Sequence, residues 1–356
     1  MYKQVQKTSK IMNMKAVLFY EPGVVKYEEI DVPEIGAGEV LIKIGTALTC
    51  GTDIKTYKRG HPVLIKTIPS GFGHEFAGTV YKVGKNVEGF KEGQRVVAAN
   101  SAPCQKCYYC RIHEYNLCEN LDLLNGAFAD YIKVPELIVK QNLLPIPDHV
   151  TFDEAAFTEP LANVVLGAEE LNIKQGQTVG IIGLGPIGLM FVRLAKLKGA
   201  RVIAAGRNPL KLHLAKEFGG ADEVINLLEV PDPKKAFLDF TSEGKGLDIA
   251  IEAVGLPELW EKMIDLVRKG GTVNLFGGCK SGTKITLDTR RIHYDEIKIA
   301  STFHHTPRHI REALKLISEG HVDVRKLITH TLPISQIAEA IRLHNEGKAI
   351  KIALKP

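Results

Sequence analysis

The segment QTVGIIGLGPIGLMFVRLAKLKGARVIAAG, residues 177–206, contains the pattern that decides the fold. It begins with a short apolar run typical of a buried strand, continues as an amphipathic stretch typical of a helix, and ends in a second apolar run. Pro186 suits the first turn of that helix, and Gly199 suits its end. A strand, a helix and another strand in this order predict the start of a parallel sheet.

The same alternation continues to about residue 304. Further helices are predicted at residues 209–220 and 258–271, and further strands at residues 247–255 and 271–278. Consecutive strands that are joined by helices form parallel sheets with helices on both faces. This part of the chain is therefore predicted to be an α/β domain built on a doubly wound parallel sheet.

The rest of the chain follows a different pattern. Before about residue 150, short alternating and β-branched runs are broken by glycine and proline, which predicts a compact barrel or sandwich. The predicted strands there are residues 15–20, 39–48, 76–84, 94–100 and 129–135. After about residue 304 we expect two helices and a last strand, at residues 308–320, 334–347 and 348–356.

Composition places the chain among ordinary globular proteins with room for two domains. Of its 356 residues, 45% are hydrophobic and 24% are charged, and the net charge is +5. Three of the positive charges, on Lys3, Lys7 and Lys10, lie in an N-terminal stretch without acidic residues. The charge that remains is too small to predict a nucleic acid or an anionic membrane as a partner.

The N-terminus and the apolar runs bear on location. Residues 1–13 are expected to be a tail, either disordered or added by an upstream start, because the stretch from Met14 resembles a natural beginning. No apolar run approaches the length of a signal-peptide core or of a membrane span. A cytoplasmic location is therefore expected, and there disulfides are disfavoured.

Three glycines predict a dinucleotide site. Gly183, Gly185 and Gly188 form G-x-G-x-x-G where a strand meets a helix, with Pro186 and Ile187 inside the motif. In such turns the first glycine allows the tight bend, the second lets the backbone approach a pyrophosphate, and the third packs helix on strand. A glycine-rich turn without a ligand is the alternative, and the strand–helix context counts against it.

The end of the next strand bears on cofactor preference. An acidic residue there would bind the ribose of NAD, but the strand ends in Gly206 followed by Arg207. Glycine leaves room for a 2′-phosphate, arginine offers it a bidentate donor, and Lys211 adds a second positive charge. NADP(H) is therefore favoured over NAD(H), with a solvated surface arginine as the alternative.

Four of the six cysteines lie within fifteen residues, as Cys104, Cys107, Cys110 and Cys118. Ferredoxins share the spacing of the first three cysteines, but their last cysteine follows sooner and precedes proline. Redox pairs belong to a thioredoxin-like context that is missing around this loop. Four thiolates on a short loop suit a closed, tetrahedral, structural zinc site. Unligated thiols are the alternative.

A second group of metal-ligating residue types is spread over the first part of the chain. Cys50 and His74 are both good zinc ligands, Glu75 follows His74, and Glu159 could complete a set. A protease motif H-E-x-x-H is excluded, because Gly78 stands where the second histidine would be. From spacing alone, Cys50 and His74 could equally be core residues.

Five stretches in this order resemble the zinc-dependent medium-chain dehydrogenase/reductase superfamily, in its branch of sorbitol and threonine dehydrogenases. They are CGTD (50–53), GHEFAG (73–78), the four-cysteine lobe, TEPLA (158–162) and GLGPIG (183–188). The resemblance implies a GroES-like β-barrel catalytic domain, residues 1–160 and 304–356, around a Rossmann domain, residues 161–303. It also implies two zinc ions per chain, one catalytic and one structural, and a homo-oligomer that is a dimer or tetramer.

The resemblance also implies roles for individual residues. Cys50, His74 and Glu75 match the active-site zinc residues, and Glu159 matches a glutamate that reaches zinc directly or through its water. Thr52 matches the hydroxyl that passes the substrate proton onward, although it could also simply cap the helix that follows. The implied reaction is hydride transfer between a secondary alcohol or polyol and the nicotinamide, with zinc as the Lewis acid.

Some positions depart from the pattern of the family. Lys55 stands where many relatives have a histidine that relays the proton, which leaves the proton route open. His304 and His305 replace an arginine–tyrosine pair of sorbitol dehydrogenases, which leaves the substrate open; surface histidines are the alternative. Cys279 has no evident partner and is interpreted as a loop or core thiol.

Two other functions stay open at this point. One is a threonine-type amino-acid dehydrogenase, against which the missing relay histidine counts weakly. The other is a non-catalytic NADP-binding protein that keeps the same fold. Cys50, His74 and Glu159 count against it, since nothing structural requires an open zinc site.

Overall fold

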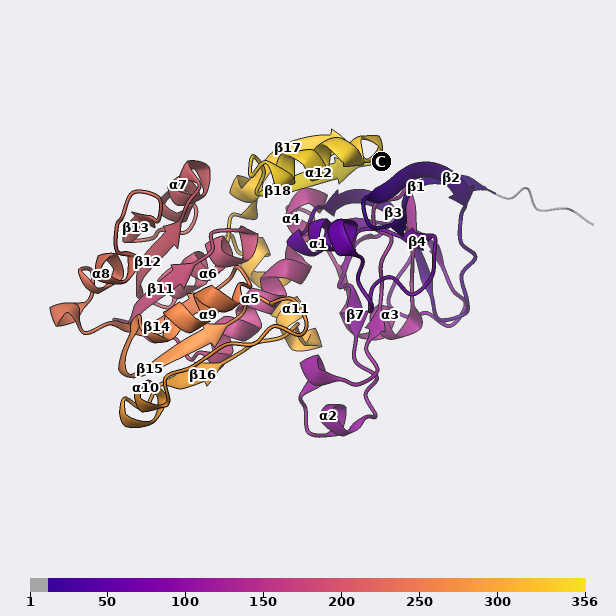
Figure 1. Ribbon diagram of the computed structural model, residues 1–356. Helices are drawn as coiled ribbons and strands as arrows, with labels where there is room; N and C mark the ends of the chain where they lie inside the picture. The colour runs from indigo at the N-terminus through magenta and orange to yellow at the C-terminus, as the bar shows by residue number, and fades with distance from the viewer. Residues whose placement is uncertain (1–11) are drawn as a thin grey trace, which may run out of the picture.

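A computed structural model describes residues 12–356, and it shows two sheet-based parts side by side (Figure 1). The parallel sheet and its helices lie on the left, and the N-terminal strands lie on the right. The expected tail of residues 1–13 falls almost entirely outside the described residues. Asn13 does not belong to it, because it already pairs with Asp31 in the first strand.

The predicted doubly wound parallel sheet is confirmed. Its six strands lie in the order β13-β12-β11-β14-β15-β16, and all neighbours are parallel. Their bounds are β11 Thr178–Ile182, β12 Arg201–Gly206, β13 Glu223–Asn226, β14 Leu247–Glu252, β15 Val267–Leu275 and β16 Lys298–Ala300. The strand order reverses between β11 and β14, and ligands bind in the crevice outside the carboxyl ends of strands at such a point.

Helices connect these strands, and one of them begins and ends as its sequence predicts. Pro186 is the first residue of α6, and Gly199 follows its C-cap with a φ of 78°, a conformation that glycine adopts without strain. The helices of this part are α6 Pro186–Leu197, α7 Pro209–Glu217, α8 Pro233–Leu238, α9 Pro257–Ile264 and α10 Thr289–Tyr294, with a 3₁₀ turn at Ser242–Gly244.

The helix predicted for residues 258–271 is wrong in its second half. Helix α9 ends at Ile264, and the chain enters β15 at Val267, which pairs with Leu247 of β14. Both Val267 and Leu266 are buried, so the apolar periodicity continues although the backbone has already joined the sheet. Over so short a run, a buried strand and the buried face of a helix have the same pattern of apolar residues.

The N-terminal part is built on a seven-stranded sheet of order β10-β6-β5-β3-β18-β17, with β9 also paired to β3. The bounds are β3 Val40–Leu48, β5 Glu75–Val83, β6 Arg95–Ala98, β9 Tyr131–Val134, β10 Leu143–Pro145, β17 Ile328–Pro333 and β18 Lys351–Lys355. A second sheet has the order β2-β1-β4, from Val24–Asp31, Asn13–Glu21 and Ser70–Gly71. A two-stranded ribbon joins β7 Ser101–Ala102 to β8 Asp122–Leu123.

The C-terminal segment returns to this sheet. Ala353 of β18 pairs with Leu48 of β3, which sets the last strand beside the end of the third. The sequence predicted β18 but missed β17, and the helix expected at 334–347 is a 3₁₀ turn, Ile334–Gln336, followed by α12, Ile337–Asn345. This pairing brings residues near 350 next to residues near 50.

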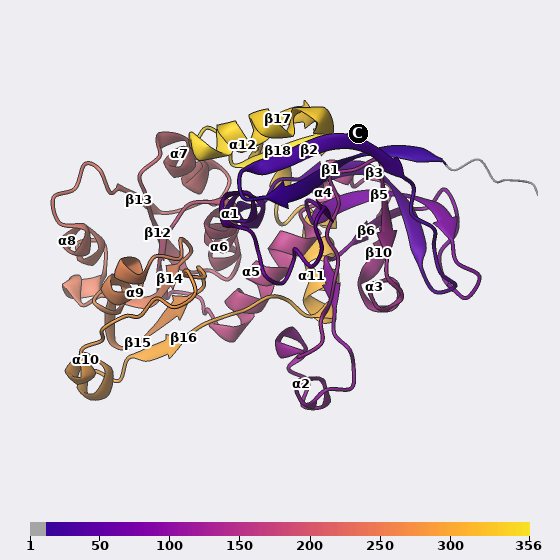
Figure 2. The ribbon, with the colours of Figure 1, turned by 45° about the vertical axis from the view of Figure 1, so that its right-hand side comes forward.

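Two helices lie between the sheets in both views (Figure 2). They are α5 Thr158–Glu170 and α11 Pro307–Ser318, and α5 packs against both α11 and α6. Phe157 and Leu161 are fully buried here, within one apolar cluster that also contains Leu48 and Phe191. One continuous core therefore joins the two parts, and each such buried side chain contributes about 1.5–3 kcal/mol.

The remaining short elements are α1 Gly51–Arg59, α2 Tyr108–Arg111, α3 Glu136–Asn142 and α4 Phe152–Ala155, with 3₁₀ turns at Tyr115–Leu117 and Val324–Leu327. Helix α2 belongs to a lobe that projects away from both sheets in the two views. Within residues 12–356, no helix combines the length and the apolar character needed to cross a membrane.

Candidate functional site

Cys50 begins the site at the start of helix α1. It is the N-cap of that helix: its sulfur accepts a hydrogen bond from Thr52 N at 3.4 Å, and its own N–H donates to Asp53 Oδ2 at 2.8 Å. The interpretation of Thr52 as the cap is therefore wrong. The N-terminus of a helix favours a negatively charged group at this position.

His74 approaches from the chain just before β5 and is 4% exposed. Its Nδ1 lies 3.0 Å from Asp53 Oδ1, in an ion-pair contact rather than a well-aligned hydrogen bond. Burial alone would lower the pKa of His74, but Asp53 and the Cys50 sulfur outweigh it and raise the pKa well above its usual value. A carboxylate beside one ring nitrogen orients the other nitrogen as a metal ligand.

Glu75 opens β5 and is completely buried. Its Oε2 accepts a hydrogen bond from Lys351 Nζ, and Lys351 is only 1% exposed. The other oxygen, Oε1, is buried and has no hydrogen-bond partner among residues 12–356. Burial raises the pKa of Glu75, and the charges of Lys351 and His74 oppose that effect.

These three side chains form a donor set that suits a metal ion. One ligand atom each of Cys50, His74 and Glu75 lies within 4.8 Å of the others. Sulfur, imidazole nitrogen and carboxylate oxygen are the ligands that zinc takes in proteins. A buried carboxylate oxygen without a partner is costly, and a cation beside Glu75 Oε1 would remove that cost. The residues present therefore fit a zinc ion.

Glu159 lies beside this set but does not join it. It stands in the first turn of α5, where its Oε1 accepts a hydrogen bond from Asn163 Nδ2 at 3.3 Å. His305 Nε2 lies 3.8 Å from the same oxygen. Burial raises the pKa of Glu159 to about 7, and His74 and Glu75 are among the charges that act on it.

His304 and His305 are not surface histidines. His305 is 3% exposed, and the two rings stack with their centroids 4.0 Å apart. His304 Nε2 lies 2.6 Å from Ser101 Oγ, and His305 Nε2 lies 3.3 Å from Asn100 Oδ1. The structure therefore brings both histidines to the side of Glu159.

Helix α1 also faces the parallel sheet. Thr52 is partly buried and Lys55 is exposed, and the positive charge of Lys55 acts on the buried carboxylate of Glu252. Glu252 ends β14 and accepts hydrogen bonds from Val254 N at 2.8 Å and Gly255 N at 2.9 Å. The carboxyl end of β14 at the crevice and the Cys50 helix are therefore neighbours.

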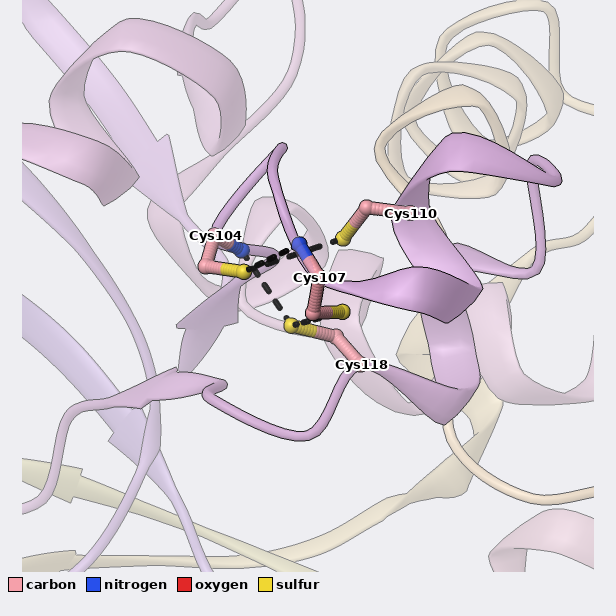
Figure 3. A group of neighbouring side chains, drawn as sticks. All are labelled: Cys104, Cys107, Cys110 and Cys118. Carbon is pink, nitrogen blue, oxygen red and sulfur yellow. Dashed lines mark hydrogen bonds between the residues drawn. The ribbon is translucent and has the colours of Figure 1, made fainter.

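The four clustered cysteines converge as the sequence predicts (Figure 3). The sulfurs of Cys104 and Cys110 lie 4.0 Å apart, and those of Cys107 and Cys118 lie 3.8 Å apart. Four sulfurs held about 2.3 Å from one zinc ion in a tetrahedron are about 3.8 Å from one another. Among residues 12–356 no disulfide joins any of the six cysteines.

Backbone N–H groups point at these sulfurs as well. Cys104 N donates to Cys118 Sγ at 3.2 Å, and Cys107 N donates to Cys104 Sγ at 3.4 Å. Backbone donors lower the pKa of Cys104 to about 6, whereas burial raises the pKa of Cys110 to about 12. Four thiolates at such short distances need a cation, and this lobe also fits zinc.

The dinucleotide turn has the geometry that its sequence requires. Gly183 has a φ of 102°, and a Cβ on Gly188 would lie 1.8 Å from the carbonyl oxygen of Gly183. A Cβ on Gly185, which caps α6, would have no protein atom within 4 Å. Gly183 and Gly188 are thus required by the chain itself, while Gly185 leaves open space at a helix N-terminus.

The residues expected at the 2′-phosphate follow β12. Gly206 ends that strand, Arg207 is exposed, and Lys211 is partly buried, which lowers its pKa. Asn208, which the sequence did not reveal as important, accepts a hydrogen bond from Lys211 N at 3.3 Å and donates to the carbonyl of Gly347 at 2.9 Å. It links this corner of the crevice to the C-terminal segment.

Comparison with known proteins agrees with this geometry. The family described as zinc-binding dehydrogenase matches residues 186–319, and the alcohol dehydrogenase GroES-like domain matches residues 36–148. A sorbitol dehydrogenase of Bacillus subtilis (strain 168) is 32% identical over 97% of this chain and 98% of its own length. The chain belongs to the zinc-binding dehydrogenase family.

Other members of the family show how wide its substrates are. An L-threonine 3-dehydrogenase of Bacillus licheniformis is 32% identical over 97% of this chain and 99% of its own length. A Sinorhizobium meliloti 1021 protein, described as a zinc-binding dehydrogenase and solved bound to NADP, has a TM-score of 0.87. It is 29% identical and covers 97% of this chain and 100% of its own.

The resemblance seen in the sequence is thereby confirmed. This zinc-binding dehydrogenase is an oxidoreductase of the zinc-dependent alcohol and polyol type, and its substrate is a small molecule. The structure brings Cys50, His74 and Glu75 together and sets Glu159 beside them. Cys279 is a half-buried thiol in the loop after β15, as interpreted from the sequence.

Lys351 and Asn163 were missed, and so was the contact of His305 with Glu159. A signal for Lys351 exists in the sequence, where it is the one charge inside the apolar run 349–354. Asn163 follows Glu159 by four residues, the spacing of neighbours on one helix face, so this contact is local. His305 carries no local signal, and it meets Glu159 only because α5 begins next to residue 305 in the folded chain.

Replacing Lys351 with methionine should lower the free energy of unfolding by about 3–5 kcal/mol, because it leaves Glu75 buried without its cation. Lys355→Met is the matched control on the same strand, since its pair with Asp153 is part-exposed and should contribute about 0–1 kcal/mol. Denaturant unfolding of both variants measures the difference. Equal losses would contradict the role given to the buried pair.

Proposed function

We propose that this enzyme oxidises a secondary alcohol of a polyol or sugar-derived alcohol with NADP⁺ in preference to NAD⁺, and catalyses the reverse reduction. The observation that carries the proposal is the convergence of Cys50, His74 and Glu75 around one buried, partnerless carboxylate oxygen. That set lies next to Glu159 and at the start of the helix that faces the dinucleotide crevice.

Two zinc ions per chain are part of the proposal. Cys50 and His74 hold the catalytic ion, with Glu75 or Glu159 as a further ligand, and Cys104, Cys107, Cys110 and Cys118 hold the structural ion. A catalytic zinc and a nicotinamide supply a Lewis acid and a hydride acceptor. The catalytic ion needs an open coordination position for the substrate, whereas the structural ion needs a closed set of four ligands.

The chain's own residues orient the alcohol and move its proton. Thr52 follows Cys50 by two residues, and its hydroxyl receives the proton and passes it toward the cofactor ribose. Glu159, whose pKa is about 7, can hold or release a proton at neutral pH. Burial of Glu159 and Glu75 excludes water from the reacting centre.

The cofactor assignment rests on the residues after β11 and β12. Gly183, Gly185 and Gly188, with Pro186 and Ile187 between them, present the N-terminus of α6 to the pyrophosphate. Gly206, Arg207 and Lys211 take the 2′-phosphate of NADP. The NADP found in the Sinorhizobium meliloti relative supports this preference.

Domain limits, location and assembly extend the proposal. The catalytic domain comprises residues 1–160 and 304–356, and the dinucleotide domain comprises residues 161–303. Two observations support these limits: β18 pairs with β3, and the six strands from β11 through β16 form one parallel sheet. We also propose a cytoplasmic location and a homo-oligomeric assembly, either a dimer or a tetramer.

Threonine oxidation is a second candidate. A relative named L-threonine 3-dehydrogenase matches this chain over almost its full length with the same identity as the sorbitol dehydrogenase. Both reactions oxidise a secondary alcohol and use the same site chemistry. Turnover of purified protein with polyols, sugar-derived alcohols and threonine distinguishes them.

Purified protein should contain two zinc ions per chain by elemental analysis. Cys50→Ser should remove one ion and leave the fold intact, because the buried core around the site holds without it. Cys107→Ser should remove the other and lower the melting temperature, because structural zinc contributes folding free energy. Cys279→Ser should keep both ions. A single ion that survives Cys50→Ser would contradict the catalytic site.

Cofactor preference should depend on Arg207. A charge-assisted hydrogen bond contributes about 1.5–3 kcal/mol, so Arg207→Ala should reduce the preference for NADP⁺ by roughly 10- to 150-fold in kcat/KM. Efficiency with NAD⁺ should change little. Lys216→Ala removes an exposed charge at the far end of α7 and should leave the preference intact. Equal efficiency with both cofactors in the wild type would show that Arg207 is merely solvated.

The chemical step should depend on Glu159 and Thr52. On the best alcohol of the substrate screen, Glu159→Gln and Thr52→Val should each lower kcat by about 10²- to 10⁴-fold. Cofactor affinity, measured by fluorescence titration, should change little in either variant. Glu169→Gln, on the same helix but in an exposed pair with Arg308, is the control. Full turnover in both variants would overturn the assigned mechanism.

A further inference from the structure

One oxygen of Glu159 has two nitrogen neighbours. Asn163 Nδ2 donates to Oε1 at 3.3 Å from the next turn of α5, and His305 Nε2 lies 3.8 Å from the same atom. No hydrogen bond to Oε2 is found within the described part of the chain. The carboxylate is therefore anchored through one oxygen only.

The ring of His305 is itself held in place. Its Nε2 lies 3.3 Å from Asn100 Oδ1, which fits a proton on Nε2 donated to that oxygen, and 3.8 Å from Glu159 Oε1, a close contact beyond hydrogen-bond distance. The ring stacks on His304, whose Nε2 meets Ser101 Oγ at 2.6 Å. Such contacts fix the rotamer of His305 and hence the position of Nε2.

The turn that carries these rings is also braced. His304 has a φ of 63°, a left-handed conformation that is costly for a residue with a side chain. Asn116 Nδ2 donates to the carbonyl of Phe303 at 3.2 Å, which ties the turn to the cysteine lobe. The surrounding structure thus holds His305 where an unstrained loop would not.

We propose that His305 is a positioning residue: together with Asn163 it fixes Glu159 Oε1, so that Oε2 is the oxygen that serves the metal site. The inference rests on the proposed function. Glu75 is arranged in a comparable way, with Oε2 bound by Lys351 and Oε1 buried without a hydrogen-bond partner among residues 12–356. In each carboxylate, one oxygen is then held by neighbouring side chains and the other is available to the metal site.

Loss of His305 changes the freedom of Glu159. With only Asn163 on Oε1, the carboxylate can rotate and present Oε1 as well as Oε2 to the set of Cys50, His74 and Glu75. A second carboxylate oxygen at the metal fills the position that the substrate alcohol needs. The change should therefore appear both in the coordination of the metal and in turnover.

The test uses full-length protein loaded with Co²⁺, whose visible absorption spectrum reports the coordination of the metal. Subtracting the spectrum of the Cys50→Ser variant leaves the absorption bands of the Cys50 site. His305→Ala should shift those bands and lower kcat at least tenfold, with little change in the KM for cofactor. His305→Gln, whose amide nitrogen reaches the place of Nε2, should restore both properties. His305→Asn, whose amide reaches only the place of Nδ1, should not.

Two further variants serve as controls. Adding Glu159→Gln to His305→Ala should return the cobalt spectrum to that of Glu159→Gln alone. His309→Ala removes a buried histidine that contacts Thr306 and Glu169 instead, and it should leave the spectrum unchanged. If alanine at position 305 prevents folding, the contrast between the glutamine and asparagine variants decides.

Failures of the inference and of the proposed function look different. A Cys50-dependent cobalt spectrum that is the same in His305→Ala, or equal losses in His305→Gln and His305→Asn, would overturn the positioning role alone. A cobalt spectrum that does not depend on Cys50 would overturn the proposed metal site itself.

Discussion

The buried ion pair of Lys351 and Glu75 joins residues 276 positions apart and holds the active site together. Taking both charges out of water is expensive, and the pair is stable only because β18 is hydrogen-bonded to β3 and delivers Lys351 to the start of β5. One lysine thus satisfies one oxygen of Glu75 and leaves the other for a cation. Cys50, His74 and Glu75 come from the N-terminal third of the chain, but the charge that makes the burial of Glu75 tolerable comes from its last strand.

Burial of like charges is the second constraint on the site. The Cys50 sulfur and the carboxylates of Glu75 and Glu159 converge where water is excluded, and each would repel the others when ionised. Lys351 and His74 offset part of this charge, and a divalent cation would offset the rest. The same requirement explains the cysteine lobe, where four sulfurs converge. In both places the donor atoms converge at distances that only a metal ion makes favourable.

Local patterns in the sequence predicted what depends on neighbouring residues, and they failed where contacts are distant. Gly183 and Gly188 are required by one tight turn, and the cysteines by one loop, so both were visible in the sequence. The helix expected at 258–271 was half wrong because pairing of Val267 with Leu247 is a tertiary choice. The capping role considered as an alternative for Thr52 is wrong, because Cys50 takes that place. The link between His305 and Glu159 spans 146 positions along the chain and left no local signal at all.

The C-terminal segment explains why the dinucleotide domain can interrupt the catalytic one without separating cofactor from metal. Gly347 accepts a hydrogen bond from Asn208, which lies between the proposed phosphate ligands Arg207 and Lys211. Three residues earlier, His344 Nε2 meets the hydroxyl of Thr49 at 2.6 Å, directly before Cys50. Four residues later, Lys351 reaches Glu75. A single stretch of eight residues, 344–351, therefore touches Asn208 beside the proposed phosphate ligands, Thr49 before Cys50, and Glu75. Because these contacts are made by one short segment, a shift of the crevice relative to Cys50 and Glu75 must strain it.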